Sequence, residues 1–86
     1  MQIDGAVVSE QGITFAVVAV KQHVVQARST ANQAIASFAP VFPGMPIVLM
    51  GQDGRGRPTY FGRPDIARFL SRVPMSALPW KRYSVS

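Results

Sequence analysis

The stretch that decides the fold is ITFAVVAV, at residues 13–20. It is apolar at nearly every position and rich in β-branched residues, so an extended chain here needs cover on both faces. We therefore predict a central strand. Residues 3–8 alternate as in a strand with one face half exposed, and residues 10–12 (EQG) supply a turn between the two segments. Together they predict a β-hairpin.

A helix is predicted next, beginning near Ser29 or Thr30. Residues 30–33 (TANQ) match the T-x-x-Q capping box. One apolar stripe follows with i, i+3, i+4, i+7 spacing: Ala31, Ala34, Ile35 and Phe38. Pro40 ends this helix, because continuing past it would cost ~3 kcal/mol. Residues 21–28 remain open, since they either prolong the second strand or begin the helix.

The second half of the chain predicts a strand, a turn and a returning strand. Residues 40–46, rich in proline, form a packed connector, in which Gly44 lets the chain reverse. Residues 47–50 (IVLM) are uniformly apolar and form a buried third strand. The Asp-Gly pair in residues 52–56 predicts a hairpin turn with positive φ at Gly54. Pro58 cannot donate to a ladder, so the strand over residues 57–61 lies at an edge or begins its pairing after Pro58.

A second helix is predicted to open at residues 62–65 (GRPD), because proline suits the first turn and Asp65 favours the positive end of the helix dipole. Its core-facing residues are Ile66, Phe69, Leu70 and Val73. Pro74 ends it. Residues 78–85 form either a last strand or a segment that wraps the surface.

These elements predict a single α+β domain over residues 1–86, with a mixed four- or five-stranded sheet in β-β-α-β-β-α order plus a C-terminal extended tail. The crossover through the first helix makes the third strand parallel to the second. Helices on one face of the sheet are the simplest packing. The predicted core is Phe15, Val17, Ile35, Phe38, Val48, Phe69 and Leu70.

Composition limits the function classes. With 48% hydrophobic and 15% charged residues, the 86-residue chain is suited to one globular domain. It contains no cysteine, which excludes disulfides, thiolate catalysis and zinc sites built on sulfur. The absence of cysteine favours a reducing compartment, and no apolar run approaches the ~20 residues of a transmembrane helix. We expect a cytoplasmic protein that does not bind a membrane.

The sequence does not favour an enzyme. His23 is the only histidine, and the four carboxylates, Asp4, Glu10, Asp53 and Asp65, lie at predicted turns and caps. A carboxylate pair for acid–base chemistry is the enzymatic alternative that stays open. Residues 51–56 contain three glycines but match neither phosphate-loop pattern, and no helix follows them directly. We predict no catalytic residues, no metal site and no cofactor.

Charge supplies the candidate site. The net charge of +5 is carried by residues 44–86, because the charges of residues 1–43 cancel. Arg68 and Arg72 form an i,i+4 like-charge pair, which helix energetics disfavours. Together with nearby arginines they are the candidate anion-binding residues: Arg63, Arg68, Arg72, Arg55 and Arg57. The aromatic residues that could stack on bases are Tyr60, Phe61, Trp80 and Tyr83. The plainer alternative is a solvated helix face beside core aromatics.

The leading functional hypothesis is a non-enzymatic binding module whose basic C-terminal half contacts an acidic partner, either nucleic acid or an acidic protein. The alternative is a homo-oligomeric structural or regulatory protein that binds no nucleic acid. Such a protein would assemble through a sheet edge or through Phe42, Met45 and Trp80.

Overall fold

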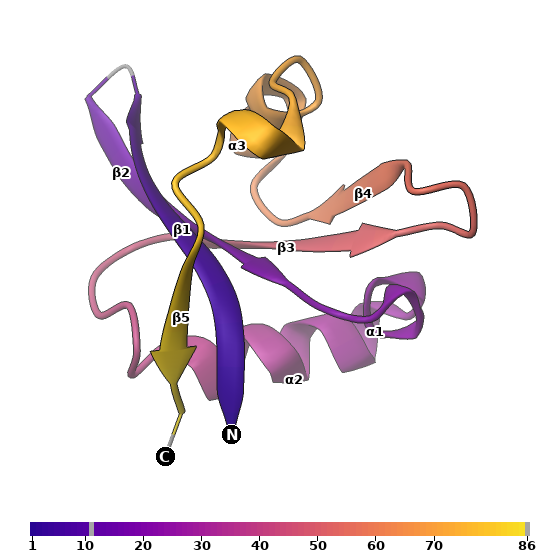
Figure 1. Cartoon of the computed structure of the whole chain (residues 1–86). Helices are drawn as coiled ribbons and strands as arrows, with labels where there is room; N and C mark the ends of the chain where they lie inside the picture. Colours follow the sequence, from indigo (N-terminus) through magenta and orange to yellow (C-terminus); the bar gives the residue numbers. More distant parts are fainter. Residues whose placement is uncertain (11, 86) are drawn as a thin grey trace.

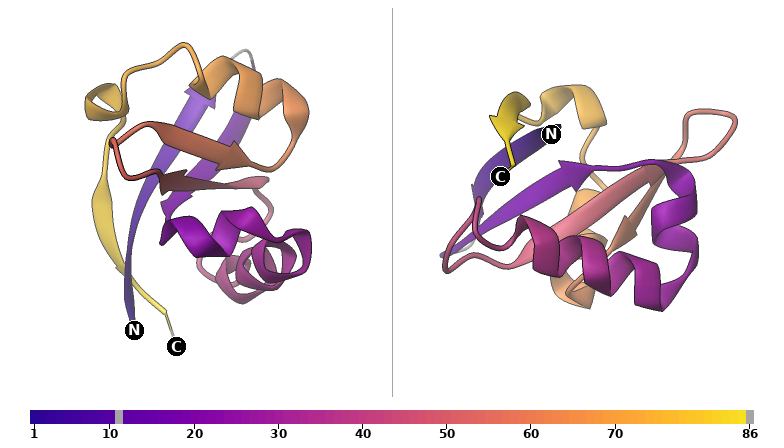
Figure 2. Two further views of the ribbon diagram at one scale, coloured as in Figure 1. Left: turned by 90° about the vertical axis from the view of Figure 1, so that its right-hand side faces the viewer. Right: turned by 90° about the horizontal axis from the view of Figure 1, so that it is seen from below.

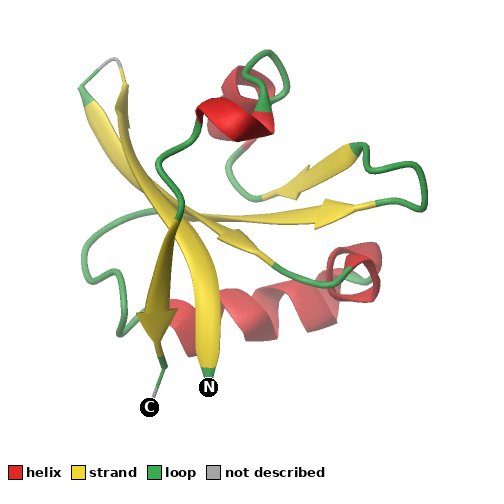
Figure 3. Ribbon diagram, viewed as in Figure 1, coloured by secondary structure: helices red, strands yellow, loops and turns green. Residues whose placement is uncertain are grey.

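The computed structural model describes residues 1–10 and 12–85 and has an α+β fold (Figures 1 and 3). In chain order its elements are β1 (Gln2–Glu10), β2 (Ile13–Ala19), α1 (Gln22–Gln26), α2 (Arg28–Phe38), β3 (Ile47–Gln52), β4 (Pro58–Phe61), α3 (Pro64–Leu70), a 3-10 turn η1 (Met75–Ala77) and β5 (Lys81–Ser84). The predicted element order is confirmed in outline. Two additions are the short helix α1 and the 3-10 turn.

The strands form one mixed sheet in the order β4-β3-β2-β1-β5. β2 lies beside β3 in parallel, with Ala16 opposite Ile47, and every other pairing is antiparallel. β2 is therefore the middle strand of the sheet, as predicted. β4, which begins at Pro58, is an edge strand. The C-terminal tail forms the other edge, where β5 pairs with the first half of β1.

Helices cover both faces of the sheet, which corrects the expectation of helices on one face. α1 and α2 lie on one side, and α3 lies on the other (Figure 2). β2 shows why one layer of helices is not enough. Ala16 and Val18 pack towards α1 and α2, whereas Phe15 and Val17 pack towards α3, and all four are buried. A strand that is apolar on both faces requires cover on both.

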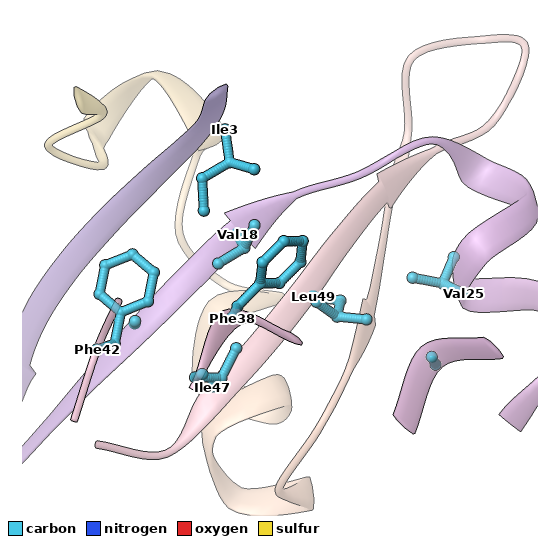
Figure 4. Packing of buried hydrophobic residues seen from close by; sticks show 9 residues of the cluster. Ile3, Val18, Val25, Phe38, Phe42, Ile47 and Leu49 are labelled. Carbon is cyan, nitrogen blue, oxygen red and sulfur yellow. The ribbon is translucent and has the colours of Figure 1, made fainter. Parts of the chain in front are cut away.

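The larger cluster fills the space between the sheet and α2 (Figure 4). Phe38 from α2 lies among Val18, Ile47 and Leu49 of β2 and β3, whereas Phe42 from the connector lies towards β1, with its ring 3.1 Å from where a Cβ of Gly5 would be. The connector is thus packed, as predicted, and Phe42 is only 2% exposed. Of the predicted core residues, five are buried, namely Phe15, Val17, Phe38, Val48 and Leu70. Ile35 and Phe69 are only partly buried, at the margins of the two clusters.

The segment before α2, for which the sequence left strand and helix as alternatives, is helical. Val25 of α1 is buried against the sheet, and α1 contacts both β3 and β4. Gly51 makes this approach possible, because a Cβ there would lie 2.8 Å from Val25 Cγ2 and 2.7 Å from Gln22 Oε1. Only Ala27 separates α1 from α2, so α2 begins at Arg28 without a side-chain cap. The predicted capping box at Thr30 is therefore wrong, since Thr30 lies inside the helix.

The β3–β4 turn is a hairpin, but its positive φ is at Gly56 (φ 79°) and not at Gly54. The N–H of Gly56 donates to the carbonyl of Asp53 (3.0 Å), and the N–H of Asp53 donates to the carbonyl of Arg57 (3.0 Å). The loop therefore has three residues. In such loops a type I turn is followed by one left-handed residue, which places the glycine requirement at the last position.

Candidate functional site

The five candidate arginines lie on two separate parts of the surface, the β3–β4 turn and the α3 region. At the turn, Arg57 Nε contacts Asp53 Oδ2 at 2.9 Å. Asp53 Oδ1 also accepts the backbone N–H groups of Arg55 (2.8 Å) and Arg57 (3.0 Å). These bonds lower the pKa of the Asp53 carboxyl. The bond from the backbone N–H of Arg57 has the largest effect, and the bond from the N–H of Arg55 has the next largest. Asp53 and Arg57 therefore have a local role in shaping the turn, and Arg55 is exposed without an ion-pair partner among the described residues.

Arg63 lies at the beginning of α3 and faces Asp65. Its Nη2 is 2.8 Å from Asp65 Oδ2, and its Nε is 3.2 Å from Oδ1. This side-chain bond is the main cause that lowers the pKa of Asp65. Asp65 is therefore paired with Arg63 and not with Arg68, three residues further along α3. Both members of the Arg63–Asp65 pair are about half exposed, so water and salt weaken their attraction.

Arg68 is exposed on α3, as the predicted helix phase requires, because Ile66 and Leu70 face the core. Arg72 is exposed too, but the helix ends at Leu70 and not at Pro74 as predicted, so Arg68 and Arg72 are not an i,i+4 pair within one helix. Within residues 1–10 and 12–85 neither guanidinium has a carboxylate in ion-pair range. Arg68 lies in the last turn of α3, and Arg72 follows its C-terminus. The structure therefore leaves both side chains available but surrounds neither with a pocket among those it defines.

A groove of about 500 Å³ brings Arg63 together with residues from a distant part of the chain. One wall is a face of α2, formed by Arg28, Asn32 and Ile35. The remaining lining comes from the beginning of β3 and the end of β4: Pro46, Ile47, Phe61, Gly62 and Arg63. The lining thus combines two arginines and one asparagine with apolar residues from α2 and the two strands. Sequence reasoning missed Arg28 and Asn32, although the 28, 32, 35 spacing marks one helix face once α2 begins at Arg28.

Gly62 fixes the wall on the strand side. A Cβ at this position would lie 2.8 Å from Val48 Cγ2 and 3.1 Å from the carbonyl oxygen of Ile47. Only glycine allows the chain to approach β3 this closely as it leaves β4. This approach holds Phe61 and Arg63, on either side of Gly62, against the beginning of β3.

A second hollow, of about 460 Å³, lies on the α3 side of the sheet. Its lining is mainly apolar: Asp4, Ala19, Met50, Gln52, Met75, Ser76 and Trp80. Its polar groups have partners within the chain. Trp80 Nε1 donates to the carbonyl of Met75 (2.9 Å), and Asp4 Oδ1 is 2.8 Å from Arg82 Nε. Among the described residues no arginine or lysine lines this hollow, so it is less suited to an anion than the groove is.

Among the remaining polar residues, the carboxylates Glu10 and Asp65 line one small hollow, with Phe15 and Phe69 beside them. Three of the four carboxylates, Asp4, Asp53 and Asp65, are in ion pairs, and His23 is exposed on α1. Among these residues no group of three or more histidine or acidic side chains could hold a metal ion. The described helices are also all too short to cross a membrane.

Comparisons with known proteins give no assignment: no protein-family model, no curated protein and no solved structure matches this chain.

Proposed function

We propose that this protein is a non-enzymatic binding module that holds an anionic group of a partner in the groove between α2 and the end of β4. The observation that carries the proposal is the convergence of Arg28 and Arg63, which lie far apart in the sequence, on one groove of about 500 Å³. Guanidinium groups bind carboxylates and phosphates through paired hydrogen bonds. The neighbouring apolar side chains, Ile35 and Phe61, displace water and so strengthen such bonds.

The existing Arg63–Asp65 pair is compatible with this role. The pair is exposed, so a partner's anion can share or replace Asp65 at little cost. Until then Asp65 holds the guanidinium in a defined position. Arg28 has no carboxylate within 4.0 Å in the described residues, so its charge is open to a partner.

The other cations support the approach of an anionic partner. The net charge is +5, and Arg55, Arg68 and Arg72 are exposed without ion pairs among the residues the structure describes. Such a field raises the rate of encounter and depends on ionic strength. The groove supplies the specific contact, and the arginines elsewhere on the surface supply long-range attraction.

The test is an amide chemical-shift titration of isotope-labelled protein with single-stranded DNA of mixed sequence and with poly-glutamate, each at two salt concentrations. We expect shifts at the groove that decrease at higher salt. Arg28→Gln with Arg63→Gln should abolish the shifts. The matched pair Arg68→Gln with Arg72→Gln removes the same charge and should only reduce the affinity.

Two results would refute this proposal. One is the absence of binding to either polyanion at low salt. The other is the reverse ranking of the two double variants, which would assign the contact to the α3 surface. A protein that only self-associates would instead change its size with concentration and not with salt.

A further inference from the structure

We infer that the groove receives an extended acidic segment of a partner protein, which adds as a strand to the free edge of β4. The inference rests on the proposed function and names the partner for the same site. It depends on two features that lie side by side: the outward backbone groups of β4, and the two arginines, Arg28 and Arg63, that line the groove.

The hydrogen-bond pattern identifies the free backbone groups. The N–H of Asp53 donates to the carbonyl of Arg57, so these two residues form a hydrogen-bonded pair. Such pairs alternate along an antiparallel ladder, and therefore Thr59 and Phe61 also direct their N–H and C=O groups towards β3. Tyr60 directs its own groups outward. Outside the sheet no backbone hydrogen bond of the described residues involves Tyr60.

The same alternation explains Pro58 and limits the contact. Pro58 shares the outward side with Tyr60, so its missing N–H costs no bond to β3. It also denies that donor to an added strand, which protects the first part of this edge. At the other edge of the sheet, β5 carries the charges of Lys81 and Arg82. The unprotected part is therefore a short edge centred on Tyr60 and leading to Gly62.

Register determines which partner side chain enters the groove. A strand bonded to Tyr60 would place its flanking residues opposite Thr59 and Phe61, with their side chains on the same face as that of Phe61. Phe61 packs with the α2-side cluster and lines the groove. The partner side chain opposite Phe61 therefore points into the groove that Arg28 and Arg63 line. A glutamate there matches both guanidiniums, and its methylenes can contact Ile35.

This geometry favours a peptide over a nucleic acid. Outward N–H and C=O groups on an edge strand match another polypeptide backbone, whereas a phosphodiester chain has no donors to pair with the carbonyl groups. A nucleic acid also needs a track of cations along its length, but the groove contains two guanidiniums between α2 and β4. One or two acidic side chains are the better fit.

The experiment uses a fluorescein-labelled peptide in which glutamate alternates with valine and threonine. We expect saturable binding by fluorescence anisotropy and slowed hydrogen exchange of the Tyr60 amide. Arg28→Gln and Arg63→Gln should each weaken binding at least about tenfold, the effect of one charge-assisted hydrogen bond. Arg72→Gln, which removes the same charge elsewhere, should change the affinity less than twofold.

The decisive control is the same peptide N-methylated at alternate residues on the edge that faces β4. It keeps every carboxylate but loses the backbone donors, so we expect at least fivefold weaker binding. Equal binding of both peptides, or an unprotected Tyr60 amide in the complex, would overturn strand addition and leave anion binding intact. Failure of all anions at low salt would refute the proposed function itself. Circular dichroism verifies the fold of each variant.

Discussion

The β3–β4 turn provides a sharp test of the fold, because two of its glycines differ only in backbone conformation. Gly56 has a positive φ of 79°, whereas the φ of Gly54 is not positive. A Cβ at either position would meet no atom within 4 Å. Substitution by alanine therefore changes no packing at either position, and any difference in stability between the two variants reports conformation alone.

The magnitude follows from two effects. Alanine stiffens the unfolded chain, which favours folding by about 0.4–1 kcal/mol in both variants. In Gly56→Ala it also forces an L-residue into the left-handed region, at a cost of about 1–2 kcal/mol. The unfolded-state effect cancels in the comparison. We expect Gly56→Ala to be less stable than Gly54→Ala by about 1–2 kcal/mol, or roughly 4–16 °C in Tm for a domain of this size.

The assay is urea denaturation of both variants, followed by circular dichroism with thermal melts as a second measure. Gly56→Asn is the matched control and should recover part of the loss, because asparagine tolerates the left-handed region better than alanine does. A Gly54→Ala variant as unstable as Gly56→Ala would contradict the three-residue loop and restore the assignment drawn from the Asp-Gly pair.

Three further predictions concern packing and charge. Gly51→Ala should destabilise the domain by about 1–3 kcal/mol by overpacking against α1, and adding Gln22→Ala should relieve part of this in a double-variant melt. Leu70→Ala should cost about 2–5 kcal/mol in denaturant titration and more than Phe69→Ala, because Leu70 is 0% exposed and Phe69 is half-buried; the opposite order would overturn the phase of α3. The pKa of Asp53 is lower in the folded than in the unfolded chain, so its contribution to stability is complete above the unfolded pKa near 3.8 and is lost as pH falls through the folded value. Asp53→Asn should make stability less dependent on pH in acid, as measured by melts from pH 7 to pH 2, and an unchanged profile would count against this role.

The sequence was most informative where one local signal dominated. Pro40 and Pro64 mark a helix end and a helix start, and the apolar run of β2 predicted a strand buried on both faces. It was least informative where tertiary packing decided the structure. α1 has no capping signal of its own and is stabilised by Val25 against β3, which requires the missing side chain of Gly51 on a strand distant in sequence.

The apolar pattern of residues 13–20 is sufficient to predict helices on both faces of the sheet. If β2 needs cover on both faces, then a single layer of helices cannot supply it, and α3 must lie on the side opposite α2. The turn at Gly56 required a different step. The Asp-Gly pair is a signal for two-residue loops, but Asp53 pairs with Arg57 and leaves three residues between them, which moves the left-handed position by two residues.

The candidate site shows how topology redistributes charge. By sequence, the basic excess belongs to residues 44–86, yet pairing of β1 with β5 brings Asp4 from the first half to Arg82 from the second. The crossover between β2 and β3 has the opposite effect on local charge. It brings Arg28, a cation from the first half of the chain, to the groove that Arg63 lines. A surface that can bind an anion is therefore defined by which arginines the sheet order brings to one groove, as it does with Arg28 and Arg63. By this criterion Arg28 is as important as any arginine of the basic half, although the charge distribution along the chain offers no reason to select it.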